Sequence, residues 1–166
     1  MRNALILMLP FAALAATPAM VNEATISTDA AIEAARGALA QCRQDGQKVA
    51  VTVVDAAGRV KAQVRDDGAA PHTIEHSMRK AYTALSYKMT SADVGKRAAE
   101  AKGANIGPQL LPNMTTSAGG VPIKSGAMTL GAVGVSGTPG AVGGGEHDAK
   151  CAQAGIDKIA KDLSPQ

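Results

Sequence analysis

The chain has 166 residues and a formal net charge of +3 with neutral histidines, and its only aromatic side chains are one phenylalanine and two tyrosines. This length suits one domain with a real core. The mild basicity is spread along the chain without blocks of lysine or arginine, which argues against nucleic-acid binding.

The N-terminus has the pattern of a secretory signal peptide. Arg2 precedes an apolar run over residues 4–16 that is too short to span a bilayer comfortably. We expect cleavage after Ala19, with Ala15 as the second candidate, so that residues 1–19 form the signal peptide. A retained membrane anchor is the alternative. The mature protein is then expected in the periplasm or outside the cell, without a membrane span.

The domain is expected to occupy residues 28–166, after a disordered lead at residues 20–27. Thr28 and Asp29 supply the N-cap of a first helix. Apolar side chains then recur at helical spacing until Gly46 ends the pattern.

Two β-hairpins are predicted. The first joins a β-branched run over residues 49–54 to an alternating run over residues 60–64, across a turn that ends at Gly58. The second joins residues 121–123 to an apolar extended run over residues 127–135. Each hairpin contributes two neighbouring antiparallel strands.

Helices separate and follow these hairpins. Residues 72–88 place apolar side chains on one helical face, and Ser91 caps a shorter helix that ends near Lys102. An irregular loop over residues 103–119 has a length typical of functional or interface segments, and a last helix follows the glycine-dense residues 137–145. This order predicts an α+β fold, an α/β sandwich in which helices flank an antiparallel sheet of four to five strands.

The two cysteines, Cys42 and Cys151, lie on the predicted first and last helices. In a chain exported to an oxidising compartment they are candidates for a disulfide, with two buried free thiols as the alternative. Neither belongs to a Cys-x-x-Cys pair, which argues against covalent haem attachment and against a metal site made of these two alone.

Four sequence phrases follow the order seen in one known family. They are Val53–Gly58, Arg79–Ala84, Gly119–Ile123 and Gly131–Gly137. On these phrases the chain resembles the GlcG/HbpS family of haem-binding proteins, and also the C-terminal domain of the PduO adenosyltransferase, without that enzyme's catalytic domain. The resemblance implies a profilin-like sheet flanked by helices, assembly into homo-oligomers and, in some members, binding of haem or iron outside the membrane.

The cofactor implied by the resemblance is a non-covalent, b-type haem. Its iron needs an axial donor such as histidine, and its propionates need cations or hydroxyls. We expect His72, at the mouth of the helix over residues 72–88, to be the axial ligand, with Arg79, Lys80 and Tyr82 in the haem pocket. From residue chemistry alone, an exposed histidine without a partner is the alternative for His72.

Three other side chains are alternative iron ligands. His76 lies one turn after His72, as in metal sites, but no third zinc ligand stands at a recognisable spacing. His147, flanked by two carboxylates at the start of the last helix, is expected to be a solvated capping residue. Met114 in the irregular loop offers a thioether, with a gap-filling apolar residue as the alternative.

The sequence contains no recognised catalytic arrangement. No serine or cysteine lies in a nucleophile signature, and Asp66 and Asp67, beside Gly68, are expected in a solvated turn. These features argue against a conventional enzyme.

The first functional hypothesis is an extracytoplasmic haem-binding protein, acting in haem scavenging or buffering or as an accessory to a redox or sensing system. Its candidate partners are haem, further copies of the chain in a dimer or larger homo-oligomer, and an extracytoplasmic sensor or redox protein. The alternatives are an enzyme or accessory protein that binds a small metabolite or corrinoid, and a structural oligomer with an empty pocket.

Overall fold

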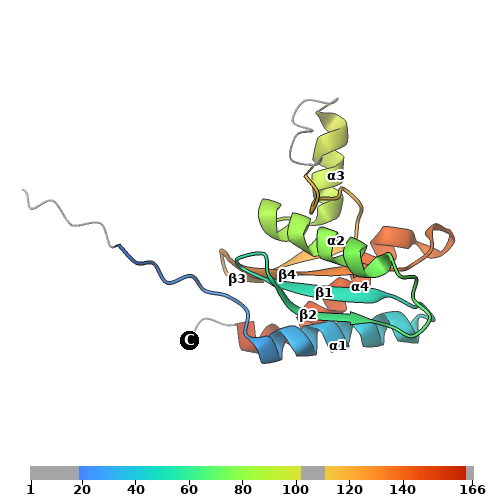
Figure 1. The fold of residues 1–166 in the computed structure, drawn as a ribbon, viewed down its shortest axis with the longest axis horizontal. Helices are drawn as coiled ribbons and strands as arrows, with labels where there is room; N and C mark the ends of the chain where they lie inside the picture. The colour runs from blue at the N-terminus through green and yellow to red at the C-terminus, as the bar shows by residue number, and fades with distance from the viewer. Residues whose placement is uncertain (1–18, 102–110, 164–166) are drawn as a thin grey trace, which may run out of the picture.

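The computed structural model describes residues 19–101 and 111–163, which form an open sheet with helices on both faces (Figure 1). The strands are β1 (Ala50–Asp55), β2 (Val60–Arg65), β3 (Gly120–Ser125) and β4 (Met128–Ser136). The helices are α1 (Thr28–Gln44), α2 (Thr73–Tyr87), α3 (Ser91–Glu100) and α4 (Gly144–Lys158), with the short 3-10 helices η2 (Gly140–Val142) and η3 (Ala160–Leu163). The order β2-β1-β4-β3, antiparallel throughout, confirms the predicted fold class with four strands.

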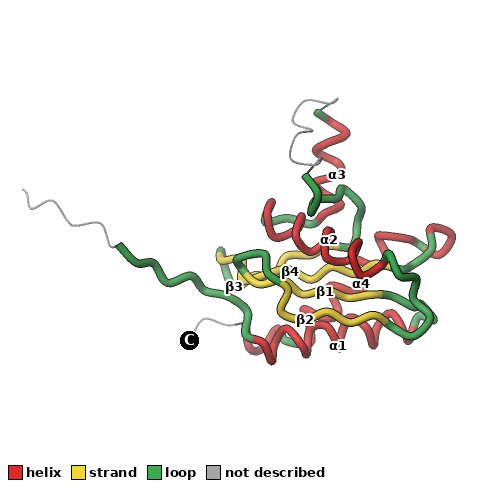
Figure 2. Tube along the Cα trace, viewed as in Figure 1, coloured by secondary structure: helices red, strands yellow, loops and turns green. Residues whose placement is uncertain are grey.

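The helices form two layers around the sheet. α1 and α4 cover one face, and α2 covers the other, with α3 rising beyond it (Figure 2). Successive side chains of a strand point to opposite faces, so Val51 and Val53 enter the core beneath α1 and α4, whereas Val54 packs under α2. None of the described helices is long and apolar enough to cross a membrane.

A disulfide joins the two helices of the larger layer. It links Cys42 on α1 to Cys151 on α4, both fully buried, across 109 residues of sequence. The disulfide considered from the sequence is therefore present, and it fastens the first helix of the domain to the last.

Two helices begin with caps one residue earlier than predicted. Ser27 caps α1 in place of Thr28 and Asp29, and its hydroxyl accepts a hydrogen bond from an α1 amide at 3.2 Å. Thr90 caps α3 in place of Ser91, through a bond of 3.1 Å. Both caps have the extended backbone that an N-cap requires.

The last residues of the lead segment, which was predicted to be disordered over residues 20–27, pack against the domain. Ile26 is 2% exposed, and its amide donates to the Leu130 carbonyl at 3.0 Å. Thr25 also accepts a bond from the Ala56 amide at 3.0 Å. The segment packs here because Ile26 completes the core beneath the sheet.

Two sequence predictions fall outside the described residues. Residues 1–18 contain nearly all of the predicted signal peptide, and residues 102–110 contain part of the predicted irregular loop. Cleavage after Ala19 therefore stays a prediction.

Candidate functional site

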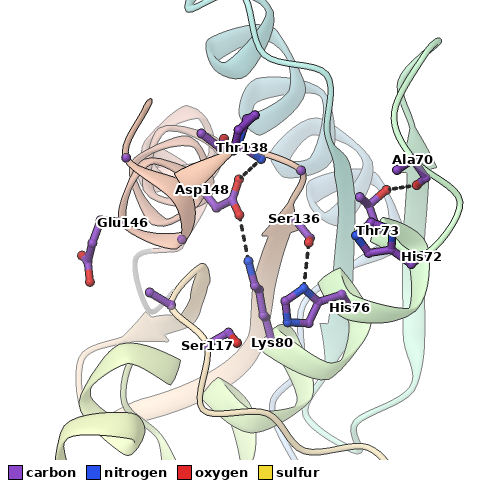
Figure 3. A pocket seen from close by; sticks show the side chains of 15 residues that line it. Ala70, His72, Thr73, His76, Lys80, Ser117, Ser136, Thr138, Glu146 and Asp148 are labelled. Atoms are coloured by element: carbon purple, nitrogen blue, oxygen red, sulfur yellow. Dashed lines mark hydrogen bonds and ion pairs between the residues drawn. The ribbon is translucent and has the colours of Figure 1, made fainter. Parts of the chain in front are cut away.

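A cavity of about 540 Å³ opens where the N-terminal ends of α2 and α4 meet the end of β4 (Figure 3). Its volume lies within the ordinary range of small-ligand pockets. Polar side chains from these elements and from loops beside them line it: His72, Thr73, His76, Lys80, Ser117, Ser136, Thr138, Glu146 and Asp148.

Helix α2 and its cap place three nitrogen-bearing side chains along the cavity. His72, His76 and Lys80 are spaced by four residues, and residues at this spacing share a helical face. His72 is exposed at the rim, His76 is half-buried and Lys80 is 2% exposed at the floor. The sequence predicted the pairing of the two histidines but not the alignment of Lys80 beneath them.

Lys80 forms a buried ion pair with Asp148, which the sequence analysis did not single out. The ammonium lies 2.8 Å from the Asp148 carboxylate and donates to the Val135 carbonyl at 2.9 Å. The other carboxylate oxygen accepts from the Thr138 amide at 3.1 Å. Burial lowers the pKa of Lys80, and Asp148 opposes this effect by favouring the charged form. Lys80, expected beside a haem propionate, thus already has a carboxylate partner.

His76 is held at the cavity wall by β4. Its Nδ1 lies 3.0 Å from the Ser136 hydroxyl. Burial is the largest cause that lowers the pKa of His76; the nearby Lys80 charge acts in the same direction and Asp148 opposes it. The imidazole therefore stays neutral to lower pH than an ordinary histidine. If Nδ1 donates to Ser136, the Nε2 lone pair is free to bind a metal.

The other residues predicted in the haem pocket divide between two places. Arg79 lines a shallow depression of about 250 Å³ with His72, Glu75 and His76, and forms an ion pair with Glu75. Tyr82 instead lines a separate depression beside Gly58. The structure thus brings Arg79 together with both histidines and leaves Tyr82 apart from them.

Met114 lies under α2 and not in the cavity. Its side chain is buried, and the Thr83 hydroxyl donates to its sulfur at 3.6 Å. The apolar, gap-filling interpretation of Met114 therefore describes its place in the fold.

Two predictions of solvated polar residues are wrong. His147 has a side chain only 18% exposed, and its Nε2 lies 3.0 Å from the Asp45 carboxylate at the end of α1. Asp66 is 3% exposed and lies 2.7 Å from the Arg43 guanidinium. In both cases α1 supplies a partner that neighbouring sequence does not reveal.

The chain is similar in sequence and in fold to proteins of one known family. A family model described as "Haem degrading protein HbpS-like" matches residues 26–157. The solved structure of HbpS is 32% identical, with a TM-score of 0.77, and the match covers 87% of this chain and 97% of that chain. No curated protein is a significant match.

Two further solved structures share the fold. Klebsiella pneumoniae protein ORFY is 26% identical, with a TM-score of 0.78, and the match covers 88% of this chain and 98% of that chain. A PduOC:heme complex is 24% identical, with a TM-score of 0.72 and coverage of 81% and 95%, and supports the fold alone.

Proposed function

The chain belongs to the HbpS-like family, and on that premise we propose that it is a haem-binding protein acting outside the cytoplasm. The observation that carries the proposal is the exposed imidazole of His72 at the rim of a cavity of about 540 Å³. Imidazole is a common axial donor to haem iron. The predicted signal peptide supports export, and scavenging, buffering and service to a redox or sensing system are the roles proposed.

The described residues fit the polar part of a haem site. His72 offers an iron donor, with His76 as the alternative, and Arg79 beside them offers a cation for a propionate. The floor is closed by the Lys80–Asp148 ion pair. Residues at the mouth of the cavity are therefore better placed to bind the haem macrocycle than residues inside it. Bound haem would supply a redox-active iron, while the protein chain would orient it and restrict access to it.

An apolar cover for the ring is the part of the site that one chain supplies least, because the cavity lining is mainly polar. We therefore propose a homo-oligomer, at least a dimer, in which a neighbouring copy completes the cover. Light scattering at micromolar concentration measures this directly, and a monomer that binds haem fully would contradict it.

We propose His72 as the axial ligand, because it lies exposed at the rim where a ligand can approach. His72→Ala should weaken hemin affinity by about 10-fold or more, since burial of the ring does not replace an axial bond. It should also remove the visible absorption bands of iron bound by a strong-field ligand such as imidazole. Titration of the purified protein with hemin, followed by visible absorption, provides the measurement.

His76→Ala and His147→Ala are the matched controls, and both should resemble the parent. If His76→Ala or His147→Ala alone loses the spectrum, the iron ligand is that histidine and haem binding stands. If none of the three matters, the assignment of a histidine ligand is wrong and non-specific adsorption of hemin has to be tested. Incubation of the complex with ascorbate in air would show whether bound haem is degraded.

The polar cavity also supports a second candidate, a small polar metabolite held inside it. Hydroxyls of Ser136 and Thr138 and the Lys80–Asp148 pair offer such a ligand hydrogen bonds that hemin does not need. Ser136→Ala should lower the affinity of the protein for such a metabolite while leaving its affinity for hemin unchanged. Calorimetric titration of the variant with each ligand separates the two cases.

A further inference from the structure

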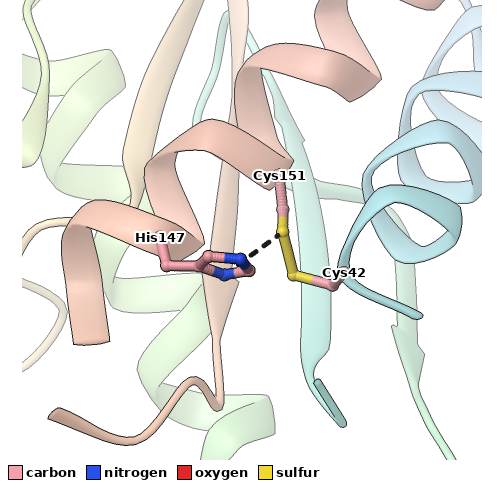
Figure 4. Close-up of side chains that lie close together, drawn as sticks. All are labelled: Cys42, His147 and Cys151. Atoms are coloured by element: carbon pink, nitrogen blue, oxygen red, sulfur yellow. Dashed lines mark hydrogen bonds between the residues drawn. A yellow bond between two sulfur atoms is a disulfide. The ribbon is translucent and has the colours of Figure 1, made fainter. Parts of the chain in front are cut away.

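Three metal-ligating side chains meet where the C-terminal end of α1 lies against α4 (Figure 4). They are Cys42 on α1, and His147 and Cys151 on α4, whose spacing of four residues places both on one helical face. The two sulfurs and an imidazole nitrogen all lie within 4.8 Å of one another. None of the three lines the cavity described above.

The imidazole is already oriented as a metal ligand would be. Its Nδ1 lies 3.8 Å from the Cys151 sulfur and 3.2 Å from the Thr138 hydroxyl, while its Nε2 lies 3.0 Å from the Asp45 carboxylate. When Nε2 donates to the Asp45 carboxylate, the Nδ1 lone pair accepts from the Thr138 hydroxyl, and a metal ion would take the place of that hydroxyl. Asp45 thus has the place of a supporting outer residue.

We propose that reduction of the disulfide converts this cluster into a zinc site with Cys42, Cys151 and His147 as ligands. A dithiol reductant would deliver two electrons and two protons to the sulfur–sulfur bond and itself become a disulfide, which leaves two thiols on the protein. Zn²⁺ then replaces both thiol protons, which pass to solvent, and forms two bonds to sulfur and one to Nδ1. Water takes the fourth position of the tetrahedron.

The backbone is placed for this conversion. The Cα atoms of the two cysteines are 5.6 Å apart, so both sulfurs can reach one ion at the usual zinc–sulfur distance of about 2.3 Å. Both cysteines are fully buried, and the partly exposed His147 and Asp45 provide the entry side. Thiolate and imidazole donors together favour zinc over magnesium or calcium.

Cobalt is the spectroscopic probe for the test. Tag-free full chain is reduced with a phosphine under inert gas and titrated with Co²⁺. We expect thiolate-to-cobalt charge-transfer bands and the intense visible bands of tetrahedral Co²⁺, saturating at one equivalent and removed by Zn²⁺. The oxidised chain should show neither. Absence of these bands from the reduced chain, or their presence in the oxidised chain, would overturn the proposal.

Substitutions identify the ligands. His147→Ala should lower the Co²⁺ affinity of the reduced chain by about 10-fold or more and alter the bands, and Asp45→Asn should weaken it by about 10–100-fold with the bands kept. Lys150→Ala, at an exposed position on the same helix, is the control and should match the parent. An unchanged affinity and spectrum in His147→Ala would overturn the assignment.

Loss of fold on reduction gives an equally decisive readout. If the reduced parent unfolds without metal, Zn²⁺ should restore its helical circular dichroism, and should fail to do so in His147→Ala. Zinc binding would then be coupled to folding. No recovery in the parent would overturn the proposal. Hemin binding by the oxidised chain is measured separately, so failure of either proposal leaves the other intact.

Discussion

The buried ion pair between Lys80 and Asp148 closes the floor of the cavity. Lys80→Ala would leave the Asp148 carboxylate buried without a cation, which should lower the free energy of unfolding by about 3–5 kcal/mol. Urea denaturation at neutral pH measures the loss. The double variant Lys80→Met/Asp148→Leu should recover most of it, because apolar side chains often replace a buried pair at little cost. A Lys80→Ala protein with the same free energy of unfolding as the parent would contradict this role of the ion pair.

Asp66 links the stability of the fold to pH. Its hydrogen bond with Arg43 is the largest cause that lowers the pKa of this carboxyl from its ordinary value of 3.8, although burial acts in the opposite direction. The carboxyl is thus more acidic in the folded than in the unfolded chain. The stability it contributes is complete above the ordinary pKa and is lost as pH falls through the lower folded value.

Asp66→Asn should therefore lower stability near neutral pH and flatten the loss of stability below about pH 5. Urea midpoints over a pH series provide the measurement. Asp67→Asn, at the exposed neighbouring carboxylate, should keep the slope of the parent. Identical acid slopes for the parent and Asp66→Asn would count against the role of this pair.

At the scale of elements, the close packing of α1 on α4 depends on a glycine. A Cβ added at Gly155 would overlap the Ala34 carbonyl and lie 3.0 Å from the Ala38 methyl. Gly155→Ala should therefore destabilise the fold by about 1–3 kcal/mol, because the backbone of α1 would have to move away. Gly140→Ala is the control, since a Cβ there meets no described atom within 4 Å. Thermal denaturation compares the two, and equal midpoints would contradict the prediction.

At the scale of the whole molecule, the Cys42–Cys151 disulfide spans 109 residues of sequence and closes a loop that contains all four strands of the sheet. In the chain-entropy model such a loop is worth about 4–5 kcal/mol, because the unfolded chain loses freedom. Cys42→Ala/Cys151→Ala should therefore unfold at a much lower urea concentration than the oxidised parent. The same double variant cannot regain stability from Zn²⁺, which separates loop closure from metal binding. Equal midpoints in variant and parent would contradict the entropic argument.

Sequence alone determined the types and order of the elements. These elements are recognised from residues that are close together in sequence. Examples are the alternation along β2, the β-branched run of β1 and the helical spacing along α1, each of which is visible within a short stretch of sequence. The predicted ends of the strands and of the first three helices lie within about two residues of the observed ones, whereas the last helix, expected to include Leu163, ends at Lys158. The caps differ by one residue because adjacent hydroxyl residues compete, and backbone conformation decides between Ser27 and Thr28.

Only the tertiary structure decided which polar side chains share a site. Lys80 and Asp148 are 68 residues apart, and Arg43 and Asp66 are 23 apart, so neither pairing has a local pattern. Asp66 and His147 were expected in solvent because their sequence neighbours are polar, whereas α1 and its C-terminal end pack beside both, burying Asp66 and leaving His147 only partly exposed. Burial and charge pairing depend on how helices lie on the sheet, and that arrangement is set by contacts distant in sequence.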